Sequence, residues 1–445
     1  MHRIEGENVD VTSGVNLFRT TPPYTVISPE LMNAIQEEIM YVISQAGMPL
    51  LNKSNDTRDQ LWTAMSRTIQ PYNYVVSSQA TFNALFTRTA ANTYKMADSY
   101  RSVYFKYVEG GYSVTPLLSG GDTWGDLYTN NASSVEFENG TYINFGSARG
   151  NITANTAGGY LRNVDIRGSG VVGAAVNSFY LQNNYVTFDN CKTSARNANV
   201  DFVGFQGSGT ALHNTTSKYR DCSVYAIDGS DKIYGYKDCS NLSNCLVYDL
   251  AGGVDYVFGY HTCNQLSGCL VNTITSTNTG SSGYHACNLL SGCLANTISS
   301  TSNARGFYTC KQISGCQAYT ITSTDAQSYG FDGCDQISGC LASTITSTND
   351  SAVGFGSCDQ ISGCQAYTIS GAAGAGDVGK GFSICNRLSA CKADAISGNV
   401  NEGFSNCTYG AALYTAEAAN SGNDYMDTAD ASHPVHKTST PDCWT

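Results

Sequence analysis

The chain has 445 residues, of which 13% are charged, and its formal net charge is −12. Phosphate contacts require a basic stripe, which this acidic chain does not supply, so nucleic acid is excluded as an expected partner. No apolar run approaches the roughly 18 residues of a membrane-spanning helix, so we expect no insertion into a membrane.

Residues 1–71 are expected to form a helical segment. Ser28 is a suitable N-cap with Pro29 at the first helical position, and apolar residues then recur at helical spacing as far as Gly47. A second helix is expected over about Thr57–Ile69, ending before Pro71. Amphipathic helices of this length cannot bury their apolar faces alone, so we expect them to pack together and against copies from other chains.

Residues 72–145 are expected to form a mixed α/β connector. The sequence predicts a short helix within Ser77–Phe86 and a strand over Ser102–Val108. Gly110–Asp126 is rich in turn residues and is expected to be an irregular loop. Val135–Phe145 predicts a strand, an Asn-Gly turn and a second strand.

From Cys239 onward the chain repeats every 23 to 24 residues, with one interval of 27, and each repeat carries a Cys-x5-Cys pair. A constant period of this size indicates one supersecondary unit stacked many times. The pairs are Cys239/Cys245, Cys263/Cys269, Cys287/Cys293, Cys310/Cys316, Cys334/Cys340, Cys358/Cys364 and Cys385/Cys391.

Each repeat also has a Gly-aromatic pair before its first Cys, an aliphatic residue between the cysteines, and a small and then a branched apolar residue after the second Cys. Apolar positions two apart mark a strand face, and a gap of three marks an inserted corner residue. The polar positions between them suit short strands and not helices. We therefore predict a mainly β fold, a right-handed parallel β-helix (solenoid) over residues 146–408 with a small N-terminal α-helical anchor. Seven regular coils at a strand spacing of about 4.8 Å would span on the order of 30 Å.

The coils from about Gly146 to Ser230 are less regular, although Cys222 fits the second cysteine column. Insertions in a solenoid commonly build its working surface. After Cys407 the pattern stops, and we expect residues 409–445 to form a C-terminal cap or a tip, because a solenoid must have its last open rung covered.

Eighteen cysteines in a short secreted chain would indicate a disulfide scaffold, but this chain is long and Met1–Glu7 shows no apolar signal-peptide core. Two interior ladders of small, polarizable side chains suit free thiols. We therefore favour reduced ladders over disulfides, in a protein that folds in a reducing cytoplasm. A zinc site is less favoured, because five residues separate each pair and no second pair converges on it. We expect no metal and no cofactor.

A helical N-terminal segment followed by a Cys-, Gly-, Ser- and Asn-rich β-helix resembles a bacteriophage tail fibre or tailspike protein. The similarity is clearest at Leu31–Ile39, continues to Ala46 and Gly47, and includes Asp59–Leu61. It resembles the short attachment segment that opens many tail-fibre chains. The resemblance implies a homotrimer in the virion tail, assembled in the host cytoplasm. It also implies attachment to a tail or baseplate protein through residues 1–71 and binding of a host surface glycan or protein.

Tailspikes of this shape are often glycosidases or lyases, so paired carboxylates are catalytic candidates. Asp335 and Asp359 occupy the same column one coil apart, at roughly the 5 Å that retaining glycosidases use, and Asp332 lies close by in sequence. The simpler interpretation is a solvent-facing corner column in which Asp and Asn suit tight turns. His261 and His285 sit in equivalent positions of neighbouring coils. They are more readily explained as exposed or half-buried side chains on the surface of the coils than as a metal or proton site.

Aromatic residues outside the regular core columns are candidates for binding, because aromatic side chains pack on apolar faces and hydrogen-bond at their edges. They are Tyr112, Trp124, Tyr409, Tyr414, Tyr425 and Trp444. Packing at a trimer interface is an equal alternative for each. The main hypothesis is a non-enzymatic receptor-binding tail fibre. The alternatives are a tailspike depolymerase that cleaves surface polysaccharide and a purely structural filament or adhesin subunit.

Overall fold

The computed structural model describes most of the chain after residue 72. The described residues are Ile35, Glu37, Glu38 and the ranges 73–122, 124–129, 132–146, 149–154, 159–169, 176–181, 186–198, 201–207, 217–229, 231–252, 255–372, 378–398, 400–411, 413–416, 425–426 and 436–438. The chain divides into two compact units, Met1–Tyr74 with Asp98–Ser102 and Val75–Ala97 with Val103–Thr445.

In the first unit, Ile35, Glu37 and Glu38 are helical and exposed, in agreement with the first expected helix. The rest of that helix and the whole second helix expected over 57–69 lie outside the described residues. No helix in the described ranges is long and apolar enough to cross a membrane.

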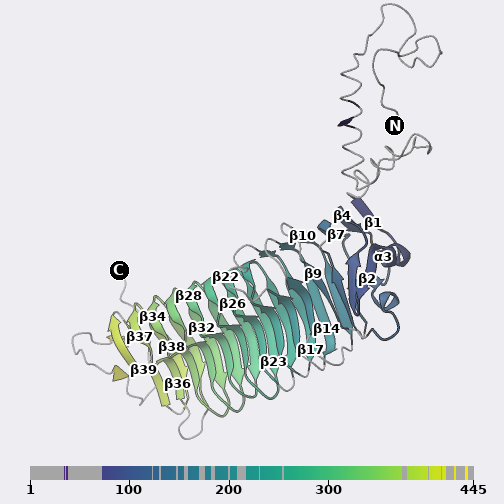
Figure 1. The fold of residues 1–445 in the computed structure, drawn as a ribbon. Coiled ribbons are helices and arrows are strands. Elements are labelled where there is room, and N and C mark those ends of the chain that lie inside the picture. The colour runs from purple at the N-terminus through teal and green to yellow at the C-terminus, as the bar shows by residue number, and fades with distance from the viewer. Residues whose placement is uncertain are drawn as a thin grey trace, which may run out of the picture. The chain divides into compact units, whose positions relative to one another are not determined.

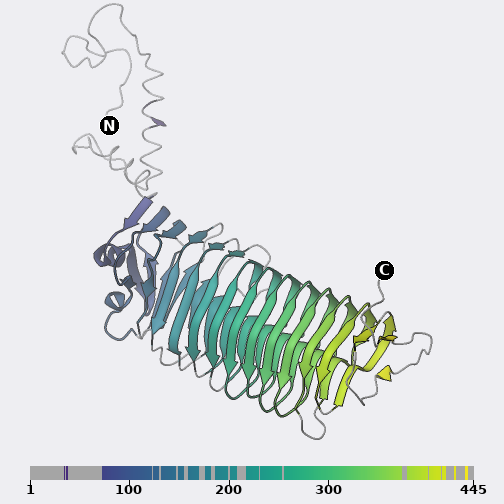
Figure 2. The same ribbon diagram turned by 180° about the vertical axis from the view of Figure 1, so that it is seen from behind.

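The second unit is a parallel β-solenoid in which successive coils add strands to three sheets, here called A, B and C (Figures 1 and 2). Sheet A contains β1 (Asn73–Val76) and β4 (Tyr100–Phe105), each of which begins in the first unit, and β7 (Ala132–Phe137), β10 (Tyr160–Arg162), β13 (Thr187–Asp189), β16 (Lys218–Arg220), β19 (Ser240–Ser243), β22 (Asn264–Ser267), β25 (Asn288–Ser291), β28 (Lys311–Ser314), β31 (Asp335–Ser338), β34 (Asp359–Ser362) and β37 (Asn386–Ser389). The last part of β39 (Val400–Ala411) pairs with β37 and so also belongs to sheet A.

Sheet B contains β2 (Phe86–Ala90), β3 (Thr93–Met96), β6 (Trp124–Tyr128), β9 (Arg149–Ala154), β12 (Val176–Leu181), β15 (Phe202–Gln206), β18 (Ile233–Lys237), β21 (Val257–His261), β24 (Ser281–His285), β27 (Ala304–Tyr308), β30 (Ser328–Asp332), β33 (Ala352–Gly356), β36 (Val378–Ser383), β39 (Val400–Ala411) and β41 (Tyr425–Met426).

Sheet C contains β5 (Tyr112–Ser113), β8 (Ile143–Asn144), β11 (Asp165–Ser169), β14 (Lys192–Ala198), β17 (Ser223–Gly229), β20 (Leu246–Gly252), β23 (Leu270–Ser276), β26 (Leu294–Ser300), β29 (Gln317–Ser323), β32 (Leu341–Ser347), β35 (Gln365–Ser370), β38 (Lys392–Ser397), β40 (Tyr414–Ala416) and β42 (His436–Thr438).

Each strand pairs in parallel with its equivalents one coil before and one coil after. Phe331, for example, is the register partner of Phe307 in one neighbour and of Phe355 in the other. The β2–β3 hairpin at the start of sheet B is antiparallel. The prediction of a mainly β parallel solenoid is confirmed.

The interior carries one continuous column of stacked rings. Neighbouring ring centroids lie 4.6–5.0 Å apart with interplanar angles of 3–10°. The column consists of Phe179, Phe205, Tyr236, Tyr260, Tyr284, Phe307, Phe331, Phe355, Phe382 and Phe404. The ring spacing equals the strand spacing, so these side chains fix the coils in register while they fill the core.

All 17 described cysteines are buried free thiols, which confirms the reduced ladders for these residues. Each directly follows a residue in the left-handed region, as Cys310 follows Thr309 (φ 51) and Cys391 follows Ala390 (φ 49). The Cys310 thiol lies 3.4 Å from the carbonyl oxygen of Tyr308 and 3.5 Å from that of Tyr284 in the preceding coil. Burial raises the pKa of the Cys391 thiol to about 11. The Cys391 thiol is therefore protonated and can donate to the carbonyls of Ile361 and Ser389 at its corner.

The gap of three in each repeat corresponds to an extra residue inside the sheet C strand. Thr344, with φ 56, lies between the buried Ala342 and Ile345, and equivalent threonines recur in the neighbouring coils. The left-handed residue turns the strand so that both apolar neighbours point inward. The extra residue is present as predicted, but its expected place at a corner between two strands is wrong, because it lies within the single strand β32.

The expected connector over residues 72–145 is partly solenoid. α3 (Gln79–Leu85) confirms the predicted short helix, and its N-cap Ser78 accepts a hydrogen bond from the Thr81 amide. The predicted β-hairpin within 135–145 is wrong, because β7 and β8 lie in different sheets and pair with β10 and β11 of the next coil. The turn after Asn139 is thus a solenoid corner.

The regular stacking also begins earlier and ends later than expected. β5 pairs with β8 and β6 with β9, so the start at residue 146 is too late, and the segment 110–126 contains strands and a 3-10 helix, η1 (Thr115–Leu117), as well as loop. At the other end β40 and β42 continue sheet C beyond residue 408. Weak hydrophobic periodicity hid these strands, which are only two to six residues long.

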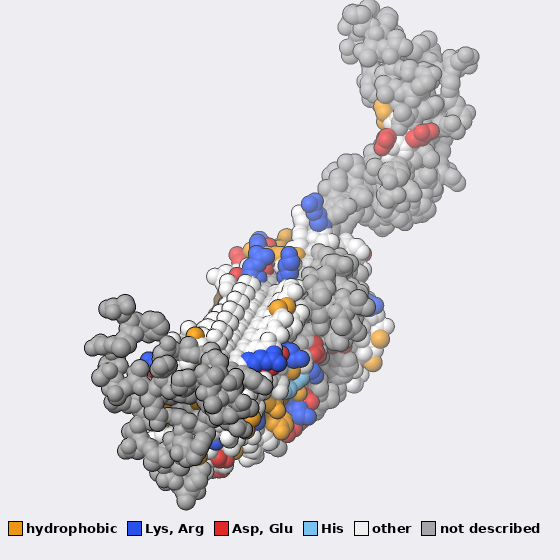
Figure 3. Space-filling model, turned by 90° about the vertical axis from the view of Figure 1, so that its left-hand side faces the viewer, with side chains coloured by type: hydrophobic (Ala, Val, Ile, Leu, Met, Phe, Trp, Pro, Cys, Tyr) orange, Lys and Arg blue, Asp and Glu red, His pale blue; other side chains and the backbone are white. Residues whose placement is uncertain are grey.

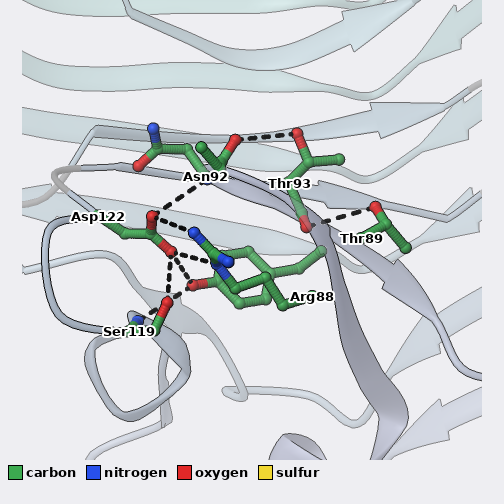
Figure 4. A network of polar contacts seen from close by, with 8 residues as sticks. Arg88, Thr89, Asn92, Thr93, Ser119 and Asp122 are labelled. Atoms are coloured by element: carbon green, nitrogen blue, oxygen red, sulfur yellow. Dashed lines mark hydrogen bonds and ion pairs between the residues drawn. The ribbon is translucent and has the colours of Figure 1, made fainter.

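The β2–β3 hairpin is tied to the loop after η1 by one carboxylate (Figure 4). Asp122 accepts hydrogen bonds from Arg88 at 2.9 and 3.0 Å, from the Tyr94 hydroxyl at 2.7 Å and from the Ser119 hydroxyl at 3.0 Å. The Arg88 hydrogen bonds hold the pKa of Asp122 well below its usual range. The network fixes the loop against the hairpin at the N-terminal end of sheet B.

A glycine column in sheet B provides a test of the core. A Cβ on Gly330 would lie 2.6 Å from the Cβ of Ala342 in sheet C and 2.7 Å from the carbonyl oxygen of Gly354. We expect Gly330→Ala to lower the free energy of unfolding by about 1–3 kcal/mol, because the backbone must shift. Thermal unfolding followed by circular dichroism measures this. Gly120→Ala is the control, since nothing lies within 4 Å of its Cβ. Equal transitions for the two variants would contradict the close approach of sheets B and C.

The cysteine ladders provide a second test. We expect the 17 described thiols to resist iodoacetamide in the native protein and to react fully in guanidinium chloride, because burial excludes the reagent and disfavours the thiolate. Peptide mass spectrometry after labelling assigns each position. Disulfide-linked peptides from these positions, or rapid native labelling, would show that the ladders are not as described.

Candidate functional site

The outer face of sheet B carries a run of aromatic, histidine and charged side chains across five successive coils, β18 to β30. All but Tyr256, which lies just before β21, come from equivalent strand positions, so they form a line along the solenoid axis that covers about 19 Å at the usual strand spacing. We call this surface the sheet-B strip. It consists of Tyr234, Lys237, Tyr256, Phe258, His261, His285, Arg305, Tyr308, Tyr329 and Asp332. Figure 3 shows histidine side chains beside hydrophobic and basic ones on this side of the molecule.

The rings of the strip contact one another from coil to coil. Phe258 stacks on Tyr256 at 5.7 Å, on Tyr234 at 5.4 Å and on His285 at 5.0 Å between ring centroids. His285 in turn stacks on Tyr308 at 5.1 Å. Tyr256 is the most open of these rings, at 46% exposed, whereas Phe258 is 9% exposed. The contacts hold an apolar surface rigid while leaving part of it accessible.

One ion pair lies at the end of this run. The Arg305 Nε donates to Asp332 Oδ2 at 2.8 Å, and the two side chains are only 16% and 15% exposed. The guanidinium carbon also lies 4.3 Å from the centroid of the Tyr308 ring and 5.7 Å from that of Tyr329. Burial raises the pKa of Asp332, and the bond to Arg305 opposes that rise. The pair is thus a fixed polar group beside the rings.

His261 and His285 form the middle of the strip, with ring centroids 4.8 Å apart. Burial lowers the pKa of both, and neighbouring His285 adds to the effect at His261, whose pKa is about 4. His261 Nδ1 contacts the Thr262 hydroxyl at 3.1 Å, while His285 Nδ1 is buried without a hydrogen-bond partner among the described residues. Both imidazoles are therefore neutral at pH 7.

The three catalytic candidates do not come together. Asp335 and Asp359 are register partners in β31 and β34 on the outer face of sheet A. Asp332 belongs to sheet B and is held by Arg305. Gln360 donates its side-chain amide to Asp335 at 3.3 Å and its backbone N–H to Asp359 at 2.9 Å. The neighbouring pair therefore already has partners on its own sheet, and no third acid joins it among the residues of β31 and β34.

Of the six aromatic candidates for binding, only Tyr112 has a described side chain. It lies in strand β5 and not in the expected irregular loop, and it is fully buried, with its hydroxyl donating to the carbonyls of Val76 at 2.9 Å and Lys106 at 2.6 Å. Trp124, Tyr409 and Tyr425 lie in β6, β39 and β41, but their side chains are outside the described part of the structure, as is all of Trp444. The same holds for the side chain of Tyr414 in β40.

Most of the sheet-B strip was missed in the sequence, where only the two histidines and Asp332 were singled out. The available signal was positional. Except for Tyr256, which lies just before β21, each strip residue either precedes the core glycine by one or follows the core aromatic by one, as Arg305 and Tyr308 flank Gly306 and Phe307. A column-by-column comparison of these outward positions would have shown the aromatic cluster. In the described residues, no group of three or more His, Cys, Asp or Glu is arranged to hold a metal ion.

No protein-family model and no curated protein matches the chain. The catalytic unit of a thermostable GH87 α-1,3-glucanase from Streptomyces thermodiastaticus strain HF3-3 aligns with 85% of this chain and 66% of its own, at 10% identity and a TM-score of 0.27. A periplasmic alginate epimerase aligns with 80% of this chain and 76% of its own, at 9% identity and a TM-score of 0.23. The chain thus spans slightly less than two thirds of the glucanase unit, and scores this low carry no activity over to it.

The histidine pair predicts an unusual titration. We expect His261 to protonate with a midpoint near pH 4, well below the ordinary value of 6.5, because burial and His285 disfavour the charged ring. Since the unfolded chain binds more protons between these values, folding stability should fall as the pH drops from about 6.5 toward 4. Two-dimensional NMR of the imidazole protons, with His261→Gln to assign the signal, measures the midpoint. A midpoint near 6.5 would show that the ring is solvated.

Proposed function

We propose that this chain is a receptor-binding fibre of a bacteriophage tail, and that its solenoid binds a host surface glycan through the sheet-B strip without cleaving it. The single observation that carries the glycan-binding part is the strip itself. It combines rigid, partly exposed rings with a few fixed polar groups on one outer face. That combination is typical of surfaces that bind small polar ligands with apolar faces, such as sugar rings.

The attachment part of the proposal rests on the sequence. Residues 31–47 and 59–61 resemble the segment that opens many tail-fibre chains, and we propose that residues 1–71 join a tail or baseplate protein. We further propose a homotrimer, located in the virion tail after assembly in the host cytoplasm. A native mass measurement tests the trimer, and labelling of assembled particles tests the location.

A binding role is favoured over a depolymerase by the surroundings of the three carboxylates. General acid catalysis requires a carboxyl group that is free to hold and deliver a proton beside the substrate. Asp332 is fixed by Arg305, and Asp359 lies 4.0 Å from the Arg387 guanidinium in addition to its bond with Gln360. Asp332 and Asp359 thus each have partners of their own, and they lie on different sheets.

The proposal is tested with purified protein and surface polysaccharide from bacteria that the particle infects. We expect binding by surface plasmon resonance with no increase in reducing ends or unsaturated products. Tyr256→Ala should weaken binding about tenfold, because it removes the most exposed ring of the strip. Tyr367→Ala is the matched control, since Tyr367 is 49% exposed on sheet C.

Three results would count against this function. Cleavage that disappears in Asp335→Asn or Asp359→Asn would establish the depolymerase instead. Equal losses in the Tyr256 and Tyr367 variants would remove the sheet-B strip as the binding surface. No binding to any surface polysaccharide would favour the purely structural role.

A further inference from the structure

We propose that Arg305 and Asp332, with Tyr256 facing them across Gly280, form a subsite that recognises one neutral sugar ring of the bound glycan through neighbouring hydroxyl groups. This inference rests on the proposed glycan-binding function and specifies which chemistry the strip selects.

The ion pair retains hydrogen-bonding groups for a ligand. The Arg305 Nε donates a hydrogen bond to Asp332 Oδ2 at 2.8 Å. Its two terminal amino groups have no acceptor, and Asp332 Oδ1 has no donor, within the described residues. A guanidinium therefore presents donors directly beside a carboxylate acceptor. Neighbouring sugar hydroxyls both donate and accept, so they match this pair.

The pair is held before any ligand arrives. The guanidinium carbon of Arg305 lies 4.3 Å from the Tyr308 ring centroid and 5.7 Å from that of Tyr329, and both members of the pair are less than one fifth exposed. An arginine that is already ordered by rings and a carboxylate loses little side-chain entropy on binding. Hydrogen bonds to such charged groups are also stronger than neutral ones.

Gly280 keeps the space between Tyr256 and Arg305 free of a side chain. A Cβ at this glycine would lie 3.6 Å from Tyr256 Cε1 and 3.7 Å from Arg305 Nη1. The exposed ring and the guanidinium, from coils on either side, therefore flank one small area of surface. An aromatic ring on one side and fixed polar groups on the other suit a sugar, which has both an apolar face and hydroxyl edges.

The charge of the strip favours a neutral sugar over an acidic one. Of its two cations, Arg305 is paired with Asp332, and Lys237 is followed directly in the chain by the acidic Asp238. The whole chain carries −12 charges, which disfavours the approach of a polyanion. A site for uronate or another acidic sugar would need an unbalanced cation, and Arg305 already has its carboxylate.

The test compares wild-type protein with Arg305→Lys and Asp332→Asn on a glycan array that presents neutral and uronate-containing bacterial oligosaccharides of matched length. Affinities are then measured by calorimetry for the best neutral ligand at low and high salt. We expect a preference for neutral glycans, little dependence on salt, and a loss of about ten- to hundredfold in each variant.

Arg167→Lys is the matched control. Arg167 also pairs with a carboxylate, Asp165 at 2.8 Å, and lies 3.9 Å from a ring centroid, that of Tyr142, but it is on sheet C. This variant should bind as the wild type does. Thermal unfolding of all the variants checks that each has folded.

The outcomes separate this inference from the proposed function. If the wild type binds neutral glycans and Tyr256→Ala weakens binding while Arg305→Lys and Asp332→Asn do not, the strip binds glycan and the subsite is overturned. Tighter, salt-sensitive binding to uronate-containing glycans overturns the neutral-sugar specificity. If the wild type binds no glycan, both the inference and the proposed function fail.

Discussion

The close contact between sheets B and C is the constraint on which the rest of the solenoid depends. In coil after coil a glycine of sheet B faces a small side chain of sheet C. A Cβ on the glycine would lie 2.6–2.8 Å from the Cβ of the facing alanine. The facing pairs are Gly306 with Ala318, Gly330 with Ala342, and Gly354 with Ala366. Such contacts leave no room for a larger residue, and they fix the two sheets at one separation. The aromatic column then fills the wider part of the coil.

The narrow interior also explains why cysteine occupies the corners. A corner bends the chain through a left-handed residue and directs backbone carbonyls toward the interior, where water cannot solvate them. A side chain at this position must be small. Serine would bury a hydroxyl whose unmet hydrogen-bonding capacity is costly, whereas the thiol adds only a weak second donor to a carbonyl that is already paired, as that of Tyr308 is with the Ala286 backbone N–H at 2.9 Å. The thiol combines a weak donor with an apolar body, so it is buried at little cost of desolvation. Free thiols are therefore sufficient, and no cross-link is required.

The buried positions that recur in every repeat could be predicted from the sequence. The short strands outside the regular repeat and the outward-facing residues were missed. The Cys-x5-Cys pairs, the aromatic column and the extra residue before Ile345 all follow from buried positions that tolerate few side chains, and they identified the solenoid. Short strands such as β5 and β8 were mistaken for loop and hairpin, since two residues carry no periodicity. Tyr112 was placed in an irregular loop for the same reason. The sheet-B strip was missed because its members are neighbours only across coils, so their proximity depends on a register that sequence spacing does not display.

The inward-facing residues are nearly the same in every coil, whereas the outward-facing residues of sheet B vary, and the two sets have different roles. Identical inward columns stabilise the stack, but an outer face that repeated identically would offer a ligand the same environment at every coil. On sheet B the equivalent outward positions change from Phe258 to Ser282, Arg305, Tyr329 and Val353. That variation defines one place along the axis where an open ring, a glycine and an ion pair meet. The surrounding coils hold these groups in register, so a ligand would meet a site that is already ordered. The solenoid thus separates its two requirements, with stability in the constant interior and selectivity in the outward residues that depart from the repeat.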